Sequence, residues 1–444
     1  MRRTLLVDAV GSCIAIDVTA LDEGDEAAVH AAWIDALADP GTEPVDTVTP
    51  RGPDRASMLS GLSQAVTLAA IEAGRGRAWM LHAAGIATTE GQVVVLVGPS
   101  GRGKTTAARA LGGVYGYVSD ETIAIDDSGR VWPYRKPLSV IEDPAAPKTQ
   151  RAPSALGLQP LPNAELRVAA VVLLDRSPEH PEVPVVEVAD LGDALEGLVS
   201  QTSFLHDHPT ALRFIAALAD ATGGIRTVKY REAASLPSVI PGLVRPSRLI
   251  ELPPRPEHIR PDTDPADSLP RFSRVDVADE VAVTDPDRVA ILTISEQRRG
   301  HVTLLGGIAP AVWRAADGAT LRQLRDAAVS TYGEPDGIDA GTAVLLGVGM
   351  LLDAGLLTSD EPLLCRRKGV VWVDSGDRIA ALIWEWLEEP VTLTQLIARA
   401  TEAAGRDAAA EVAGEVEAFI ARLAASRLVE EKVVDPDSPA AVAH

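Results

Sequence analysis

The stretch VVVLVGPSGRGKTTAARAL, residues 93–111, decides the fold of the N-terminal half of the chain. Five apolar residues come first, a glycine-rich turn follows, and a segment suited to a helix ends the stretch. From Gly98 to Thr105 the turn fits the pattern GxxxxGK[ST] without a mismatch. A pattern of this kind between a strand and a helix is typical of a phosphate-binding loop.

This loop supplies the groups that bind a nucleotide phosphate. Glycines let backbone N–H groups turn toward the phosphate oxygens, and the helix N-terminus adds its positive end. We expect ATP and Mg²⁺ as cofactors, although the motif leaves the choice between ATP and GTP open. The alternative is a glycine-rich turn that has lost phosphate binding. The expected nucleotide-binding residues are Gly98, Pro99, Ser100, Gly101, Arg102, Gly103, Lys104, Thr105 and Thr106.

Two short motifs flank the loop. LHAAG, residues 81–85, lies one hairpin upstream, and YVSDE, residues 117–121, lies just downstream. Phosphoryl transfer requires a carboxylate near the attacking oxygen, and metal and lysine charges to neutralise the phosphates. His82, Asp120 and Glu121 are therefore candidate catalytic residues. A strand-end histidine and a strand-end turn are the structural alternatives.

A basic pair, Arg135 and Lys136, follows in the sequence YRKPLSV. The pair could contact phosphate or an acidic acceptor. A solvated loop is the alternative for the same two residues.

The order LHxxG, hairpin, GPSGxGKT, helix and V-x-D-acidic resembles the HPr kinase/phosphorylase superfamily, over about residues 75–145 and weakly to about 235. The resemblance implies that His82 lies near the transfer centre. It also implies that Thr105 and Asp120 hold Mg²⁺, and that the second acid acts as the base. Glu121 stands where the family usually has Asp, a departure that argues against catalysis and does not affect the expected nucleotide binding. The glycine-rich C-terminal signature of the full HPr kinases is missing, so HPr is not the expected substrate.

Composition and pattern predict a series of domains. Six prolines and mixed charges mark a linker after the nucleotide domain, and a repeat follows it. The predicted division is an N-terminal α/β region that packs on the kinase-like core (1–75), the HPr-kinase-like domain (76–248), a Pro-rich linker (249–275), a first PqqD-like module (276–360), a second, degenerate one (361–435) and a disordered tail (436–444).

The C-terminal repeat has a nearly constant spacing. Trp313 and Trp384 are 71 residues apart, and Leu324 and Leu396 are 72 apart. Each copy begins with short strand-like pieces and continues with three helical segments. The expected fold class is therefore an α/β P-loop domain followed by tandem α+β modules that are winged-helix-like.

The first copy, APAVWRAADGATLRQLRDAAVSTYG and later LLDAGLL, resembles the PqqD-like fold, also called the RiPP recognition element. This resemblance implies that a leader peptide of a ribosomally made, modified peptide (RiPP) adds as a strand to a sheet edge. In the second copy Glu388, Glu389 and Pro390 replace the Asp-Gly turn, so we expect it to pack or dimerise and not to bind the peptide. The expected peptide-binding residues are His301, Val302, Thr303, Leu304 and Leu305.

The charge balance argues against nucleic acid as a partner. The net charge is −22, so the chain should repel a phosphate backbone. Cys13 and Cys365 cannot build a disulfide framework, and no run approaches 18 apolar residues. A cytoplasmic protein without a membrane segment is expected, and homo-oligomerisation stays open.

Three functions remain. The chain could bind a leader peptide and phosphorylate its Ser or Thr residues. It could instead be a non-catalytic nucleotide-binding scaffold that presents the precursor peptide to RiPP-modifying enzymes. The third alternative is a nucleotide-gated winged-helix transcription regulator.

Overall fold

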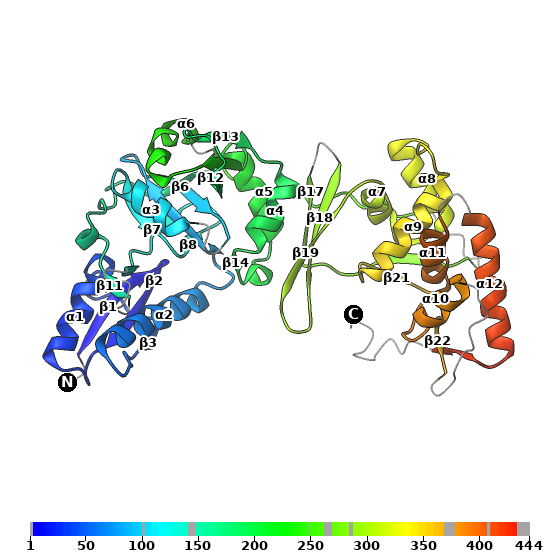
Figure 1. Cartoon of the computed structure of the whole chain (residues 1–444), viewed down its shortest axis with the longest axis horizontal. Coiled ribbons are helices and arrows are strands. Elements are labelled where there is room, and N and C mark those ends of the chain that lie inside the picture. Colours follow the sequence, from blue (N-terminus) through cyan, green and yellow to red (C-terminus); the bar gives the residue numbers. More distant parts are fainter. Residues whose placement is uncertain are drawn as a thin grey trace. The chain divides into compact units, whose positions relative to one another are not determined.

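The computed structural model describes residues 3–99, 103–140, 148–246, 248–261, 269–283, 287–367, 378–405 and 409–432. The chain divides into two compact units (Figure 1). Unit 1 comprises Met1–Pro254 and Leu292–Thr303, and unit 2 comprises Arg255–Ile291 and Leu304–His444. Among the described residues, no helix has both the length and the apolar character needed to cross a membrane.

Unit 1 is a mixed α/β structure. Its strands are β1 (Thr4–Ala9), β2 (Ser12–Asp17), β3 (Asp46–Val48), β4 (Trp79–Leu81), β5 (Ala83–Ala87), β6 (Gln92–Val97), β7 (Gly116–Ser119), β8 (Ile123–Ile125), β9 (Val131–Trp132), β10 (Leu138–Val140), β11 (Thr149–Arg151), β12 (Arg167–Arg176), β13 (Val185–Val188), β14 (Thr202–Ser203) and β15 (Arg226–Tyr230). Its helices are α1 (Glu23–Trp33), α2 (Arg55–Ala73), α3 (Lys104–Gly112), α4 (Leu191–Val199), α5 (Ala211–Ala221) and α6 (Ile240–Leu243).

The central sheet has six strands in the order β13-β15-β12-β6-β5-β7. β12 runs parallel to β6 and to β15, whereas β5 is antiparallel to both β6 and β7. The apolar run of β6 is almost entirely buried, as expected for a central strand. Ala107, Ala108 and Leu111 of α3 pack against this sheet and fix the helix behind the phosphate loop.

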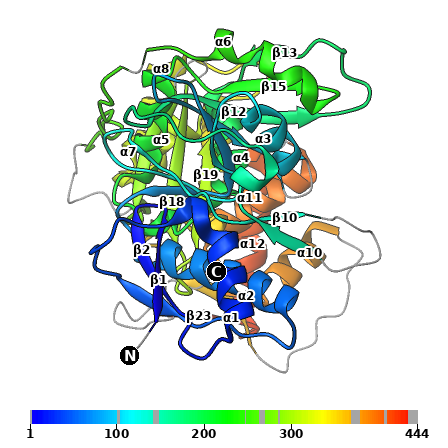
Figure 2. The same ribbon diagram turned by 90° about the vertical axis from the view of Figure 1, so that its left-hand side faces the viewer.

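The N-terminal strands and helices share one hydrophobic core with residues that follow α2 in the chain. β1, β2, α1 and α2 lie together in unit 1 (Figure 2). Their apolar side chains form one buried cluster, in which Trp33 of α1 is completely buried. Met80, Ala124 and Tyr134 belong to the same cluster.

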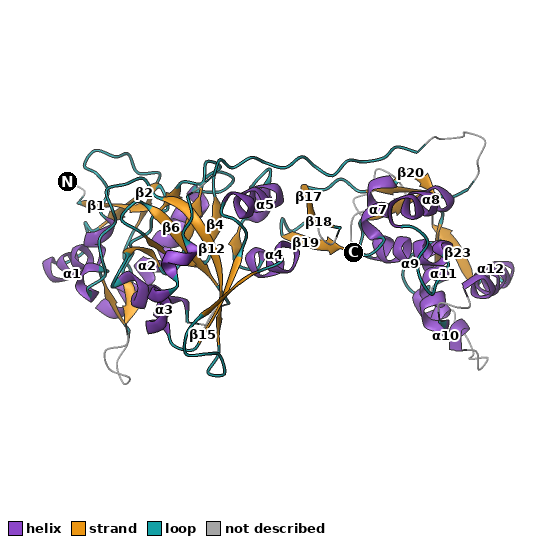
Figure 3. Ribbon diagram, turned by 90° about the horizontal axis from the view of Figure 1, so that it is seen from above, coloured by secondary structure: helices purple, strands orange, loops and turns teal. Residues whose placement is uncertain are grey.

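Unit 2 is mainly helical, with short sheets (Figure 3). Its helices are α7 (Ala309–Ala315), α8 (Leu321–Tyr332), α9 (Ala340–Asp353), α10 (Arg378–Trp386), α11 (Leu393–Ala404) and α12 (Ala409–Ala425). The C-terminal strands are β16 (Arg271–Arg274), β17 (Asp279–Val283), β18 (Arg288–Ile294), β19 (Gly300–Leu305), β20 (Asp317–Thr320), β21 (Leu357–Ser359), β22 (Leu363–Arg366) and β23 (Val429–Lys432). The tip of the β18–β19 hairpin, Leu292–Thr303, is assigned to unit 1.

Matched contacts occur in the two sequence repeats. α8 and α11 each begin with a capping box, in which Thr320 pairs with Gln323 and Thr392 pairs with Gln395. A strand arginine also lies over a helix tryptophan in each copy. Arg274 is 5.9 Å from the ring centroid of Trp313, and Arg366 is 5.8 Å from that of Trp384. Thr320 and Thr392 thus hold equivalent positions as the N-caps of their helices.

The two repeats contact each other through α9 and α11. A Cβ atom added to Gly349 would lie 2.4 Å from Cβ of Ala398, so only glycine allows this approach. One turn further along α9, Asp353 accepts hydrogen bonds from Gln395 at 2.8 Å and from Arg399 at 2.7 Å.

The Pro-rich segment contains more structure than a linker over 249–275 predicts. Ile259 donates its backbone N–H to Arg314, and Arg260 forms an ion pair with Asp317 at 2.9 Å. β16 begins at Arg271 and pairs with both β20 and β21. These pairings use backbone groups from distant parts of the chain, which proline content alone does not reveal.

Candidate functional site

The phosphate loop connects β6 to α3, as its motif predicts. Gly103 adopts the left-handed conformation with φ of +94° at the start of α3, a conformation that favours glycine. Lys104 is only 6% exposed, and its Nζ donates a hydrogen bond to the carbonyl oxygen of Gly98 at 2.6 Å. The lysine thus joins the two ends of the loop, and burial lowers its pKa. Thr105 and Thr106 are exposed at the same helix start.

Ser100, Gly101 and Arg102 of the predicted loop lie outside the described residues. The expectation that they contact phosphate therefore remains a prediction. The described residues on either side, Pro99 and Gly103, fix where the loop leaves β6 and enters α3.

His82 lies beside the loop, in the link between β4 and β5. Its backbone N–H donates to Gln201 at 2.7 Å, which fixes the link against the start of β14. Burial lowers the pKa of His82, and the Lys104 ammonium lowers it further. The charges of Glu121 and Asp120 act in the opposite direction. These interactions show that the structure gathers His82, Lys104 and the acidic pair at one place.

Asp120 and Glu121 follow β7 in a tight turn shaped by Ser119, whose Oγ accepts the backbone N–H of Glu121 and of Thr122 at 3.2 Å. Asp120 is 9% exposed, and the Tyr117 hydroxyl donates to its Oδ1 at 2.9 Å. The two acids therefore have different surroundings.

Lys136 forms an ion pair with Glu121, with 2.7 Å between Nζ and Oε2. The lysine side chain is 9% exposed and that of Glu121 is 36% exposed. Lys136 also lies near Ser63 of α2, with 3.5 Å between Nζ and Oγ. Lys136 thus belongs to the site through Glu121.

Arg135, the other member of the basic pair, has a different environment. Its Nη1 donates to the carbonyl oxygens of Tyr117 at 2.5 Å and of Gln159 at 3.1 Å, and its guanidinium lies over the Tyr117 ring. Its side chain is buried, and burial lowers its pKa. These contacts give Arg135 a structural position, which differs from the expected contact with phosphate or acceptor.

The donor set fits a magnesium nucleotide. The Asp120 carboxylate and the Thr105 hydroxyl supply the hard oxygen ligands that Mg²⁺ prefers, and Mg²⁺ usually takes one or two carboxylates together with substrate phosphates. Lys104 adds a buried positive charge at the same place. No group of three or more His, Cys, Asp or Glu arranged to hold a metal is present in the described ranges.

Two further residues, which the sequence did not single out, lie next to the loop. Arg176 ends β12, Tyr230 ends β15, and the two residues pair across these strands. A Cβ atom added to Gly103 would lie 3.5 Å from Cδ of Arg176 and 3.6 Å from the Tyr230 hydroxyl. Both residues end strand-like runs in the sequence, but only the order of strands in the sheet shows that these ends reach the loop.

The expected peptide-binding residues, His301–Leu305, lie in β19. β19 is an edge strand of the sheet β17-β18-β19. His301 and Leu304 are exposed, whereas Leu305 is buried. Trp313 donates from its indole N–H to Glu280 of β17 at 2.8 Å, so its buried ring lies against this sheet.

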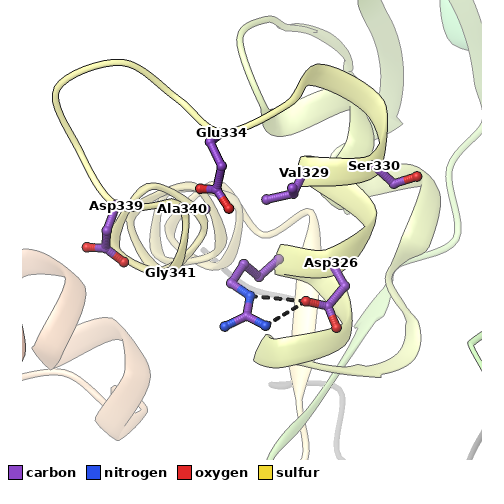
Figure 4. Close-up of a pocket in the computed structure, with 8 residues that line it drawn as sticks. Asp326, Val329, Ser330, Glu334, Asp339, Ala340 and Gly341 are labelled. Carbon is purple, nitrogen blue, oxygen red and sulfur yellow. Dashed lines mark hydrogen bonds and ion pairs between the residues drawn. The ribbon is translucent and has the colours of Figure 1, made fainter.

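A polar depression lies between α8 and α9 in unit 2 (Figure 4). Arg325 pairs with Asp326 on α8 at 2.7 Å, and Asp339 caps α9 by accepting the N–H of Thr342. The depression includes none of the predicted site residues. Its lining residues are Arg325, Asp326, Val329, Ser330, Glu334, Asp339, Ala340 and Gly341.

Comparison with protein families gives one match. Residues 375–429 match PqqD, described as coenzyme PQQ synthesis protein D. The match confirms the resemblance to PqqD for the second repeat, which contains α10, α11 and α12 and which the sequence led us to expect as the degenerate copy. The matched segment is a small part of the chain.

Other comparisons add little. No curated protein matches the chain. Among solved structures, the Hpr(Ser) kinase/phosphatase from Coxiella burnetii is similar, with 14% identity over 37% of this chain and 92% of that one, and a TM-score of 0.21. A TM-score this low carries no argument for a common fold or activity.

Proposed function

We propose that the chain recognises the precursor peptide of a RiPP and binds ATP and Mg²⁺. The observation that carries the proposal is the PqqD match over residues 375–429. Peptide recognition is the role that a PqqD-like segment suggests, and the phosphate-loop motif supports nucleotide binding by the same chain. Partner RiPP-modifying enzymes belong to the same proposal.

In both repeats we propose PqqD-type, winged-helix-like modules in tandem. Support comes from the paired capping boxes and the paired arginine–tryptophan contacts. For the first repeat we propose that the leader peptide adds to β19, because an edge strand offers unpaired backbone groups. The residues 368–377, where the second repeat would carry its corresponding strands, lie outside the described residues.

For the nucleotide site we propose phosphorylation of a Ser or Thr of the precursor peptide. Asp120 and Thr105 would hold Mg²⁺, which when bound supplies positive charge to the phosphates. Lys104 contacts the transferred phosphoryl group, and Glu121 accepts the proton of the attacking hydroxyl. Lys136 positions the Glu121 carboxylate through their 2.7 Å ion pair.

One observation favours a non-catalytic scaffold as the second candidate. Glu121 already has an ion-pair partner in Lys136, which competes with its use as a base. In this case the nucleotide would favour one conformation of the chain for presentation of the peptide to partner enzymes, with no phosphoryl transfer.

The test is the intact mass of a candidate precursor peptide from a neighbouring gene, after incubation with the full chain, ATP and Mg²⁺. We expect a gain of one phosphate that is lost in Lys104→Ala, because the variant lacks the ammonium at the loop. Lys229→Ala is the matched control, since Lys229 lies in the same sheet and pairs with Glu187. Peptide binding without any mass gain would contradict the kinase and support the scaffold. No peptide binding by the wild-type chain would contradict the recognition proposal.

A further inference from the structure

Three parallel strands end beside the phosphate loop. β6 leads into Gly98, and the neighbouring strands β12 and β15 end at Arg176 and Tyr230. Figure 3 labels these three strands within the sheet of unit 1. Ligands of open α/β sheets bind outside the carboxyl ends of parallel strands. The residues at these ends are therefore placed to contact whatever the loop binds.

Arg176 provides a positive charge at this edge. Its side chain is 41% exposed, and its Nε donates to the carbonyl oxygen of Arg231 at 3.2 Å. Glu232, itself 71% exposed, lies 3.7 Å from its Nη2. Nη1 is the nitrogen on the side of the loop, 3.9 Å from the place of a Cβ on Gly103. The Arg176 guanidinium is thus held at Nε by one carbonyl oxygen, while its Nη1 lies on the side of the loop.

Tyr230 adds an unusual polar group. Its side chain is completely buried, and its hydroxyl has no hydrogen-bond partner in the described part of the chain. Burying an unpaired hydroxyl destabilises a folded protein, so such groups call for an explanation. The hydroxyl lies 3.6 Å from the place of a Cβ on Gly103, so a ligand of the loop is close enough to be its partner.

The order of the strands gives the two sides of the loop different chemistry. His82 precedes β5, and Asp120 and Glu121 follow β7, so the groups for transfer lie on one side of β6. Arg176 and Tyr230 come from the opposite side. A nucleotide whose terminal phosphate faces the acidic pair would therefore have its nucleoside end on the side of β12 and β15.

We propose that Arg176 and Tyr230 bind the nucleoside end of the nucleotide, at its ribose and α-phosphate. This inference rests on the proposed nucleotide binding. It assigns recognition of the nucleoside end to residues outside the loop motif. Both are binding residues, and neither takes part in the transfer step.

The test measures binding of ADP, ATP and inorganic pyrophosphate to the full chain by isothermal titration calorimetry. We expect Arg176→Ala to weaken the binding of ADP and of ATP by the same factor, about tenfold, because hydrogen bonds from a charged group are strong. Pyrophosphate should bind as before, since it fills only the sites of the outer phosphates. Arg231→Ala is the control. A loss of affinity for ATP alone would place Arg176 at the terminal phosphate. An unchanged affinity for both nucleotides would show that Arg176 lies outside the site. Either result overturns the proposal.

Tyr230→Phe separates binding from structure. We expect weaker ADP binding by about threefold or more, with an unfolding temperature without nucleotide that is unchanged or higher, because the hydroxyl has no partner to lose. Tyr115→Phe is the control. A lower unfolding temperature without nucleotide would show that the hydroxyl bonds to the protein, which overturns its assignment whatever happens to ADP.

Failure of the underlying proposal looks different. A wild-type chain that binds neither ADP nor pyrophosphate contradicts nucleotide binding itself. A wild-type chain that binds both, with Arg176→Ala and Tyr230→Phe unchanged in affinity, contradicts only the assignment of these two residues.

Discussion

Among single residues, His82 is the group whose ionisation reports most directly on the phosphate loop. Its pKa lies below the ordinary value of 6.5, because of burial and the Lys104 charge. The unfolded chain therefore binds a proton at His82 more readily than the folded chain does. The contribution of His82 to the free energy of unfolding is complete above pH 6.5 and decreases as the pH falls through and below that value.

We predict that Lys104→Gln raises the pKa of His82 toward 6.5, because a nearby positive charge is removed while burial remains. Titration of the histidine ring signals by NMR measures the change, with His82→Gln to assign the signal. Lys229→Gln should leave the titration unchanged. An unaltered pKa in Lys104→Gln would show that the ammonium does not act on the imidazole.

At the scale of the elements, the junction of α9 and α11 depends on the missing side chain of Gly349. A second helical glycine, Gly414 of α12, has no atom within 4 Å of its missing Cβ. Glycine and alanine differ in helix propensity by the same amount at both positions, so the two sites separate propensity from packing.

We predict that Gly414→Ala stabilises the chain by about 0.5–1 kcal/mol, because alanine favours the helix. Gly349→Ala should instead destabilise it by about 1–3 kcal/mol, since its Cβ would lie 2.4 Å from Ala398. Urea denaturation followed by tryptophan fluorescence measures both. Equal stabilisation by the two variants would mean that the helices separate without cost.

Local patterns were predictable at this scale, and long-range ones were not. The β6–loop–α3 unit and the cap at Thr320 follow from residues that are neighbours in the sequence. Arg176 and Tyr230 could not be found in this way, because their position depends on which strands pair with β6. For Arg135 the sequence left a ligand contact and a solvated loop open, because a charge pattern does not show that its partners are carbonyl groups.

For the whole molecule, the division into two compact units predicts two unfolding transitions in calorimetry. ATP with Mg²⁺ should raise the unfolding temperature of unit 1 only. The free energy of unfolding of that unit should increase by about 2.7 kcal/mol at a ligand concentration of roughly 100 times the dissociation constant. Lys104→Ala should abolish the shift. A nucleotide-dependent shift of both transitions would show that the units unfold together, and no shift would contradict nucleotide binding.

The matched tryptophans of the two repeats have a practical consequence for spectroscopy. Trp313 and Trp384 each lie close to an arginine guanidinium, within a separate hydrophobic cluster. Each copy thus contains its own natural fluorophore. Because the chain has five other tryptophans, the signal of one copy is the difference in emission between the wild type and Trp313→Phe or Trp384→Phe. Following the two difference signals gives the order in which the copies melt, without any attached dye.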